Sequence, residues 1–254
     1  MFSKKASSFL LIFMVVTSAT AQQNSSISPD TSPQSNTEDL SRGATFKFEI
    51  APDLPEFTFK IIPMLSQMGD GNHYATVGEV QVILGDSTQP LQSLDDFGFV
   101  EAPYRGADWF RAVDINFDGY KDIYMMTSWG VTGNESGCVW LYDPHVSRFE
   151  FSKDFSAIGK FILDPATNTI TTGGVGGHAG KIFRMIKYII EDNRPVPIFD
   201  VLQTWDTERN KYHCVVKQRQ SDDNVLGIVR DVWGDVGNLD EAPCNASDPL
   251  FLIQ

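Results

Sequence analysis

The sequence is poor in the features that mark several common protein classes. It has 3 cysteines, 4 histidines and 20 basic residues against 33 acidic ones, for a net charge of -13. Binding to a phosphate backbone needs a basic face, so this charge balance argues against a nucleic-acid partner. The cysteine content is too low for a small disulfide scaffold, and with 42% hydrophobic residues the chain is expected to fold around a hydrophobic core.

Long hydrophobic runs are also missing. The run Phe9–Val16 is far shorter than the ~20 residues that a membrane-spanning helix needs. It follows Lys4 and Lys5 and precedes the small residues Ala19–Ala21, which is the pattern of a secretory signal peptide. We therefore expect residues 1–21 to be cleaved, with no membrane span in the remainder. The alternative is a retained anchor or a buried helix.

Residues 22–44 form the next segment, which is dominated by Ser, Thr, Gln, Asn and Pro. A segment of this kind buries too little apolar surface to offset the entropy lost on ordering, so we expect a disordered, flexible polar linker. The folded part should then span residues 45–254. That length is sufficient for one large domain, and no interior boundary divides it.

Motifs of catalysis are absent from the sequence, and one formal match to a nucleotide-binding motif, G-x-G-x-x-A at 174–179, lacks the context it needs. The sequence contains neither G-x-S-x-G nor H-E-x-x-H. The glycine-rich stretch Gly173–Lys181 misses the P-loop spacing, and no strand–helix–strand pattern surrounds it. We expect no catalytic residues and no enzymatic activity, although the many carboxylates leave a glycosidase pair open as an alternative.

Short strand patterns fill the remainder of the chain, and turn-forming residues separate them. Amphipathic patterns of helical length are rare, and one candidate, 106–113, could equally be a strand or a turn. These observations predict an all-β fold of the sandwich, barrel or propeller type, without identical repeats. The predicted strands are 45–50, 57–62, 77–84, 123–127, 138–142, 149–151, 160–163, 169–172, 181–190, 197–204, 211–218 and 225–232.

The three cysteines, Cys138, Cys214 and Cys244, all follow the signal sequence. An odd count allows at most one bridge within the chain. We expect Cys214 to pair with Cys244, because both flank the C-terminal section and an exported protein meets an oxidising compartment. Closing a loop of ~30 residues would stabilise the fold by about 3–4 kcal/mol in the chain-entropy description. Three buried thiols are the alternative.

The stretch Asp114–Ile123 carries the strongest chemical signal. Calcium takes six to eight oxygen ligands from an adaptable loop, in which alternate side chains point inward and a glycine makes the sharp turn. Gly119 occupies that glycine position. Side-chain oxygens fall at loop positions 1, 3, 5 and 9, which are Asp114, Asn116, Asp118 and Asp122. Position 7, which supplies a backbone carbonyl oxygen, is Tyr120.

We therefore predict a Ca²⁺ site in this loop, and expect it to be structural because one segment supplies most of the ligands. Position 12, where an EF-hand has glutamate, is Met125, and the flanks have strand patterns rather than helix patterns. Three carboxylates without a cation would repel one another, and a cation removes that conflict. The alternative is a turn braced by Asp and Asn side chains without any metal.

The glycine-rich stretch Gly173–Lys181 predicts a hairpin loop. Exposed loops carry recognition, and glycine lets the backbone approach a partner closely. We assign partner binding to Gly176, Gly177 and His178 on this loop character, and an ordinary connecting loop is the alternative. The tryptophans could stack on sugars, but such residues more often fill a core. They are Trp109, Trp129, Trp140, Trp205 and Trp233.

The order of several motifs resembles a family of exported bacterial proteins with a propeller-like β fold and one calcium loop. The resemblance covers about 80–190 and includes the calcium loop, the glycine-rich loop with His178, and the turns Trp140–Pro144 and Asp164–Ile170. The calcium loop also resembles FG-GAP and VCBS-type repeats. Residues after Pro195 lie outside the matched part. The resemblance implies a single irregular, propeller-like domain.

That family includes periplasmic inhibitors of lysozyme-like peptidoglycan hydrolases, and some members are immunity partners of toxins delivered by a bacterial-killing secretion system. The resemblance thus implies a periplasmic or secreted, non-enzymatic protein that is stabilised by calcium and inhibits such a hydrolase. A basic lysozyme would be attracted by the acidic charge of this chain. The alternative is a carbohydrate-binding or adhesive module at the cell surface.

Overall fold

The computed structural model describes residues 43–67, 73–95, 97, 100, 109–220, 223–234 and 244, apart from the side chains of 65–67, 73–75, 223 and 224. The predicted signal peptide, residues 1–21, and nearly all of the predicted linker, residues 22–44, lie outside this part of the chain. Within the described ranges, no helix has the length and apolar character needed to cross a membrane.

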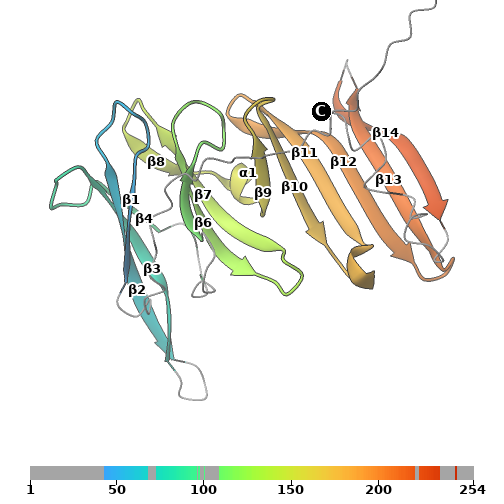
Figure 1. Cartoon of the computed structure of the whole chain (residues 1–254), viewed down its shortest axis with the longest axis horizontal. Helices are drawn as coiled ribbons and strands as arrows, with labels where there is room; N and C mark the ends of the chain where they lie inside the picture. The colour runs from blue at the N-terminus through green and yellow to red at the C-terminus, as the bar shows by residue number, and fades with distance from the viewer. Residues whose placement is uncertain are drawn as a thin grey trace, which may run out of the picture. The chain divides into compact units, whose positions relative to one another are not determined.

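Antiparallel strands make up most of the described residues and form three sheets (Figure 1). The prediction of an all-β fold is confirmed. The first sheet contains β1 (Ala44–Phe48), β2 (Phe57–Gln67), β3 (His73–Leu84) and β4 (Gln92–Leu94). The second contains β5 (Phe110–Val113), β6 (Asp122–Trp129), β7 (Glu135–Asp143) and β8 (Arg148–Phe151). The third contains β9 (Phe161–Asp164), β10 (Thr169–Val175), β11 (Phe183–Glu191), β12 (Arg194–Asp206), β13 (Lys211–Gln220) and β14 (Asp223–Gly234).

Each sheet is a meander in which strands that follow one another in sequence are also neighbours in space. The first two sheets have four strands each, which is the construction of a propeller blade, and the third has six. The segment 106–113, which could have been helix, strand or turn, provides strand β5 from Phe110 onward, and its part before Trp109 lies outside the described residues.

The first and second sheets share a core rich in phenylalanine. Phe57 and Phe59 of β2 are 0% exposed, and they alternate with outward-facing polar residues as a half-buried strand requires. Their rings meet the Phe149 ring of β8 edge-on, with centroids 5.6 and 5.4 Å apart. The Gln92 side chain donates to the Phe149 carbonyl oxygen and accepts from its N–H, which ties β4 to β8.

A short helix, α1 (Lys153–Ser156), lies between the second and third sheets in the chain. Its N-cap is Ser152, whose hydroxyl accepts from the Phe155 N–H, and the Phe155 ring is 1% exposed. Phe155 belongs to a buried cluster with Tyr124 of β6 and Ile170 of β10, so this cluster packs the second sheet against the third. A single turn leaves no helical periodicity in the sequence, which explains why sequence analysis did not predict it.

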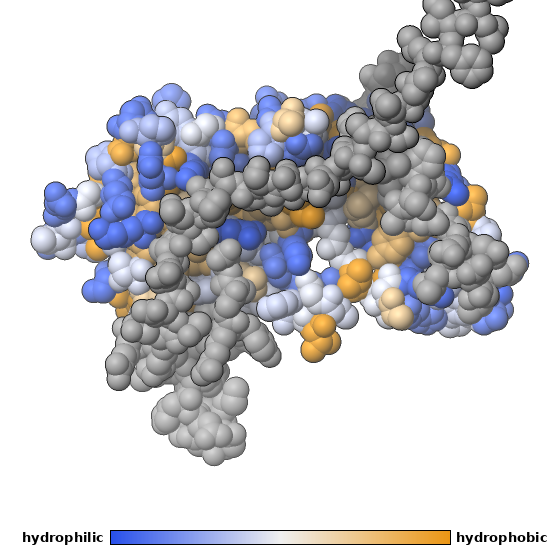
Figure 2. All heavy atoms as spheres, viewed as in Figure 1, coloured by the Kyte–Doolittle hydropathy of each residue, from blue (hydrophilic) through white to orange (hydrophobic). Residues whose placement is uncertain are grey.

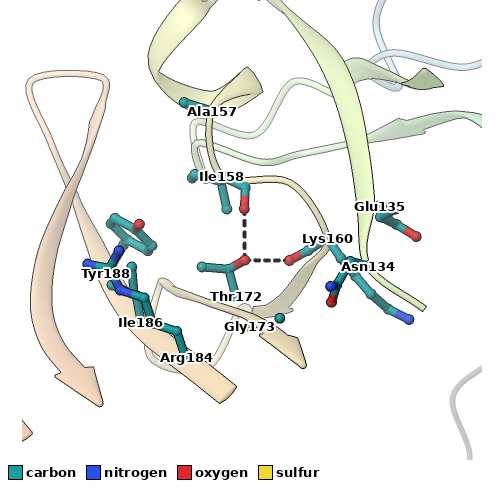
Figure 3. A pocket seen from close by; sticks show the side chains of 11 residues that line it. Asn134, Glu135, Ala157, Ile158, Lys160, Thr172, Gly173, Arg184, Ile186 and Tyr188 are labelled. Atoms are coloured by element: carbon teal, nitrogen blue, oxygen red, sulfur yellow. Dashed lines mark hydrogen bonds between the residues drawn. The ribbon is translucent and has the colours of Figure 1, made fainter. Parts of the chain in front are cut away.

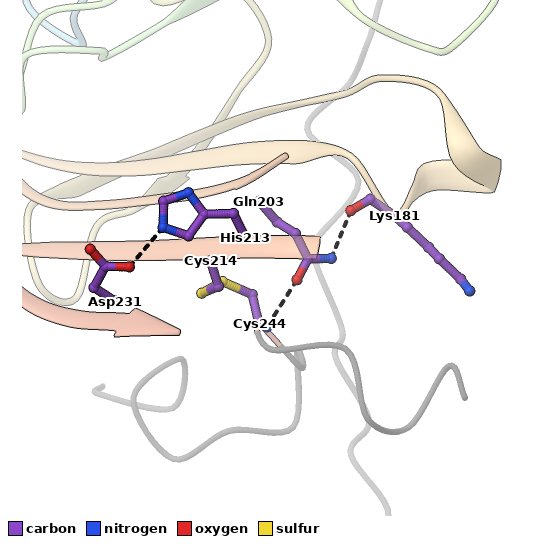
Figure 4. The surroundings of a disulfide bond; sticks show 6 residues. All are labelled: Lys181, Gln203, His213, Cys214, Asp231 and Cys244. Carbon is purple, nitrogen blue, oxygen red and sulfur yellow. Dashed lines mark hydrogen bonds and ion pairs between the residues drawn. A yellow bond between two sulfur atoms is a disulfide. The ribbon is translucent and has the colours of Figure 1, made fainter. Parts of the chain in front are cut away.

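The predicted disulfide joins Cys214 of β13 to Cys244, with Cα atoms 5.6 Å apart (Figure 4). Both cysteines are buried in a cluster on one face of the third sheet, together with Val201 and Val216. The Cys244 N–H donates to Oε1 of Gln203, whose Nε2 donates to the Lys181 carbonyl oxygen. The bridge therefore holds the chain near its C-terminus against the sheet. Cys138 is buried in the second sheet.

Candidate functional sites

The predicted calcium loop connects β5 to β6. Val113 and Asp122 are paired across the antiparallel ladder, so the two ends of the loop, residues 114–122, are held together. We call this segment the metal loop. Both flanks are strands, as expected, and the loop is not part of a helical hairpin. Gly119 has φ +92°, a left-handed conformation that a residue with a Cβ adopts only under strain.

The side chains at loop positions 1, 3 and 5 all turn inward over the loop backbone. The Asp114 carboxylate accepts from the N–H groups of Asp118, at 3.1 Å, and Gly119, at 3.0 Å. The Asn116 Nδ2 donates to Oδ2 of Asp118 at 2.8 Å. The Tyr120 N–H donates to Oδ1 of Asp118 at 2.9 Å. Side-chain oxygens from alternate residues thus converge within one tightly curled loop.

Asp122, at loop position 9, is 0% exposed. One carboxylate oxygen accepts from the Ile115 N–H and the other from the Tyr142 N–H, both at 2.9 Å. Its pKa is raised from 3.8 to about 8, chiefly by burial. The two backbone hydrogen bonds oppose this increase, and the charges of Asp118 and Asp114 add to it. Burial also raises the pKa of Asp114, and repulsion from Asp118 adds to that effect.

This set of groups fits a hard dication. The donors are all oxygens, and the charge of Asp118 opposes the ionisation of both Asp114 and Asp122. No three His, Cys, Asp or Glu side chains in the described part of the chain are already arranged to hold a metal ion. The carboxylates would therefore have to turn from the backbone N–H groups toward a cation, with the Asn116 oxygen and the Tyr120 carbonyl completing the set.

A residue that sequence analysis did not identify also contacts the metal loop. Asn193, in the turn between β11 and β12, accepts a 2.7 Å hydrogen bond at Oδ1 from Nδ2 of Asn116. The contact joins the third sheet to the second and fixes which side of the Asn116 amide points outward. Because 77 residues separate the two partners, no local pattern could have revealed the pair.

The second predicted site is the glycine-rich loop, residues 173–181. Its first three residues, 173–175, belong to strand β10 and pair with β11, so the expected hairpin loop begins only at Gly176 and continues to residue 182. Gly176, Gly177 and His178 are all exposed. The His178 ring rests against the sheet, since its centroid lies 5.1 Å from that of Trp205 and its Nδ1 lies 3.2 Å from the Tyr212 hydroxyl. The metal loop and the glycine-rich loop belong to different sheets and therefore form two separate candidate sites.

A pocket of about 320 Å³ lies between the start of β7, the segment after α1, and strands β10 and β11 (Figure 3). The Thr172 hydroxyl binds the carbonyl oxygens of Ile158 and Lys160, which closes one wall. Arg184 lines another wall, where its guanidinium forms two 2.9 Å hydrogen bonds to Asp200. Burial raises the pKa of Tyr188, which also lines the pocket. No sequence pattern indicated this pocket, because its walls come from four segments.

The tryptophans divide between the core and the surface. Trp109 and Trp140 are buried, as the core interpretation predicts. Trp129 and Trp233 are 45% and 38% exposed, and Trp205 is partly buried. The core interpretation therefore holds for two of the five residues.

Comparison with known proteins gives one informative match. No family model and no curated protein matches the sequence. The chain is similar in structure to a Xanthomonas type IV secretion system related protein, with a TM-score of 0.52, at 18% sequence identity. The match covers 76% of this chain and 96% of that protein. At this level of identity, the similarity concerns the fold alone.

Proposed function

We propose that the protein is an exported, non-enzymatic binding protein that is stabilised by calcium and inhibits a lysozyme-like cell-wall hydrolase. The observation that carries the proposal is the metal loop, in which Asp114, Asn116 and Asp118 converge beside the buried carboxylate of Asp122. When bound, calcium would supply positive charge for carboxylates that otherwise repel one another. The role of the ion is structural, because the loop closes the hairpin that joins β5 to β6.

Export is supported by the Cys214–Cys244 disulfide, since such bridges persist in oxidising compartments. The signal-like sequence of residues 1–21 supports the same location, periplasmic or secreted. The similar structure from Xanthomonas is described as related to a type IV secretion system, which is compatible with the bacterial family that the sequence resembles.

A protein partner of basic charge suits the net charge of -13, because opposite charges accelerate encounter. The exposed backbone of Gly176 and Gly177 provides a narrow edge that can enter a cleft. Figure 2 shows hydrophilic residues interspersed with hydrophobic ones over the face in view, which suits a soluble binding protein.

The test is a lysozyme turbidity assay with a suspension of bacterial cell walls. Mature protein in stoichiometric amount should protect the walls in calcium, and chelator should weaken the protection. Added salt should weaken it as well, because screening removes the attraction between the two charges. Undiminished lysis by a panel of basic lysozymes would contradict inhibition, and release of sugar or peptide by the protein alone would point to an enzyme.

A carbohydrate-binding module is the second candidate. The observation that favours it is the group of three aromatic rings at the glycine-rich loop, where Trp205 contacts both His178 and Tyr212. A partly buried indole of this kind can still stack on a sugar ring with the edge it exposes. Glycan-array or calorimetric binding to peptidoglycan fragments, lost in Trp205→Ala, would support this candidate, and protection against lysozyme without saccharide binding would contradict it.

A further inference from the structure

The turn between β6 and β7, residues 130–134, is joined to the glycine-rich loop by a single side chain. Asn134 donates from Nδ2 to the Val175 carbonyl oxygen and accepts at Oδ1 from the Val175 N–H, both at 2.9 Å. Its amide thus pairs with the end of β10 as a neighbouring strand would. Two loops from different sheets are held side by side, and both turns lie at the lower ends of their sheets in Figure 1.

Large apolar side chains stand exposed at the ends of these two hairpins, where Trp129 is the last residue of β6, Val131 lies in the turn and Val175 is the last residue of β10. Val131 is 109% exposed, Trp129 45% and Val175 40%. Single exposed apolar residues are ordinary, but several on adjoining loop tips form the kind of surface that binds another protein. Tryptophan in particular is enriched among the residues that dominate binding at interfaces.

The two loops are also held in place before any partner binds. The Gly133 N–H donates to the Gly130 carbonyl oxygen, and the Gly130 N–H to that of Asn134, which closes the β6–β7 turn. The segment after α1 approaches closely as well, since a Cβ on Gly159 would lie 2.8 Å from the Glu135 carbonyl oxygen. Rigid loops lose little conformational entropy on binding, so this arrangement favours recognition.

The pocket described above opens between these loops, because Asn134, Gly173 and Gly174 line it (Figure 3). Lys160 also lines it and is exposed. A glycoside hydrolase of the proposed class has a pair of carboxylates in its cleft, one of which an exposed ammonium can meet. The partner would then be basic overall and acidic where the loops enter.

We propose that residues 129–134 and the glycine-rich loop form one docking surface for the hydrolase, with Asn134 as the residue that positions the two loops. The proposal rests on the proposed function, and extends it to a second loop that the family resemblance does not assign to binding. Val131 and Trp129 contact the rim of the partner's cleft, and Lys160 faces its carboxylates.

The test measures affinity of the mature protein for a purified basic lysozyme by biolayer interferometry. Val131→Asp should weaken binding at least tenfold, whereas Val146→Asp should leave it unchanged, since Val146 is 54% exposed but lies in the turn between β7 and β8. Lys160→Glu should weaken binding, and Lys153→Glu, on helix α1, should not. Neither valine is buried, so folding of these variants is not in question.

Asn134→Ala should weaken binding and also accelerate amide hydrogen exchange at Val175, which links the affinity loss to release of the loop. If the wild type binds and Val131→Asp binds equally well, the second loop has no role and the proposal is wrong while the proposed function stands. If His178→Ala and Gly177→Trp also bind as the wild type does, the whole surface is wrong. A wild type that binds none of a panel of basic lysozymes overturns both proposals.

Discussion

Asp122 makes the stability of the calcium-free protein depend on pH in an unusual direction. In the folded protein its pKa is raised from 3.8 to about 8 by burial. Between those two pH values the folded state binds a proton that the unfolded state has lost. The contribution of Asp122 to the free energy of unfolding is therefore fully present below pH 3.8 and is lost as the pH rises toward 8. The slope is at most about 1.4 kcal/mol per pH unit for a single group.

Calcium should remove this loss, because a bound dication stabilises the ionised carboxylates and competes with protons for them. The assay is urea denaturation at pH 5, 6, 7 and 8, once in excess chelator and once in calcium. In chelator the free energy of unfolding should fall by several kcal/mol over this range, in line with about 1.4 kcal/mol per pH unit. In calcium it should stay level or rise.

Asp122→Asn is the matched control. The amide cannot ionise and keeps one backbone acceptor, so the slope in chelator should largely vanish, at a cost of about 1–3 kcal/mol for the backbone N–H left without an acceptor. All other ionisable side chains are retained in this variant, so the comparison with the wild type isolates the contribution of Asp122. Stability in chelator that rises between pH 5 and 8, or a slope that persists unchanged in Asp122→Asn, would refute this reasoning.

Three further predictions concern the metal loop and the disulfide. Asp118→Ala should abolish the difference between melting curves in calcium and in chelator, since it removes a central ligand; a difference as large as that of the wild type would contradict its role. Asn193 has φ 60° in the wild type, a left-handed backbone that glycine can keep. Asn193→Gly should nevertheless weaken calcium binding, measured by calorimetry, about fivefold, because it removes one hydrogen bond to Asn116. Asn193→Asp retains the acceptor and should keep the wild-type affinity. Replacing Cys214 and Cys244 together by serine should lower the free energy of unfolding by about 3–4 kcal/mol in urea, and an unchanged midpoint would show that the bridge adds nothing.

The local features of the fold could be predicted from sequence because their causes are local. Alternation in Phe57–Ile61 marks a strand buried on one face, and the glycine and aspartate turns mark where strands end. The spacing of the metal loop also follows from adjacent residues, and the structure turns those side chains inward. The pairing of Cys214 with Cys244 was favoured because both residues flank the C-terminal section and an exported protein meets an oxidising compartment.

The features that the sequence did not reveal depend on contacts between distant segments. Asn193 reaches Asn116, and Asn134 reaches Val175, through the packing of the third sheet against the second. Helix α1 is too short to leave a periodic pattern. The grouping of strands into three sheets, and the pocket between their edges, depend on the same packing.

Isothermal titration calorimetry of the metal-stripped mature protein with calcium tests the central claim most directly. The account predicts one saturable binding event per chain in the wild type and none in Asp118→Ala, with both proteins folded by circular dichroism. Titration of the wild type without binding heat at several temperatures, and with no calcium-dependent shift in melting temperature, would contradict it.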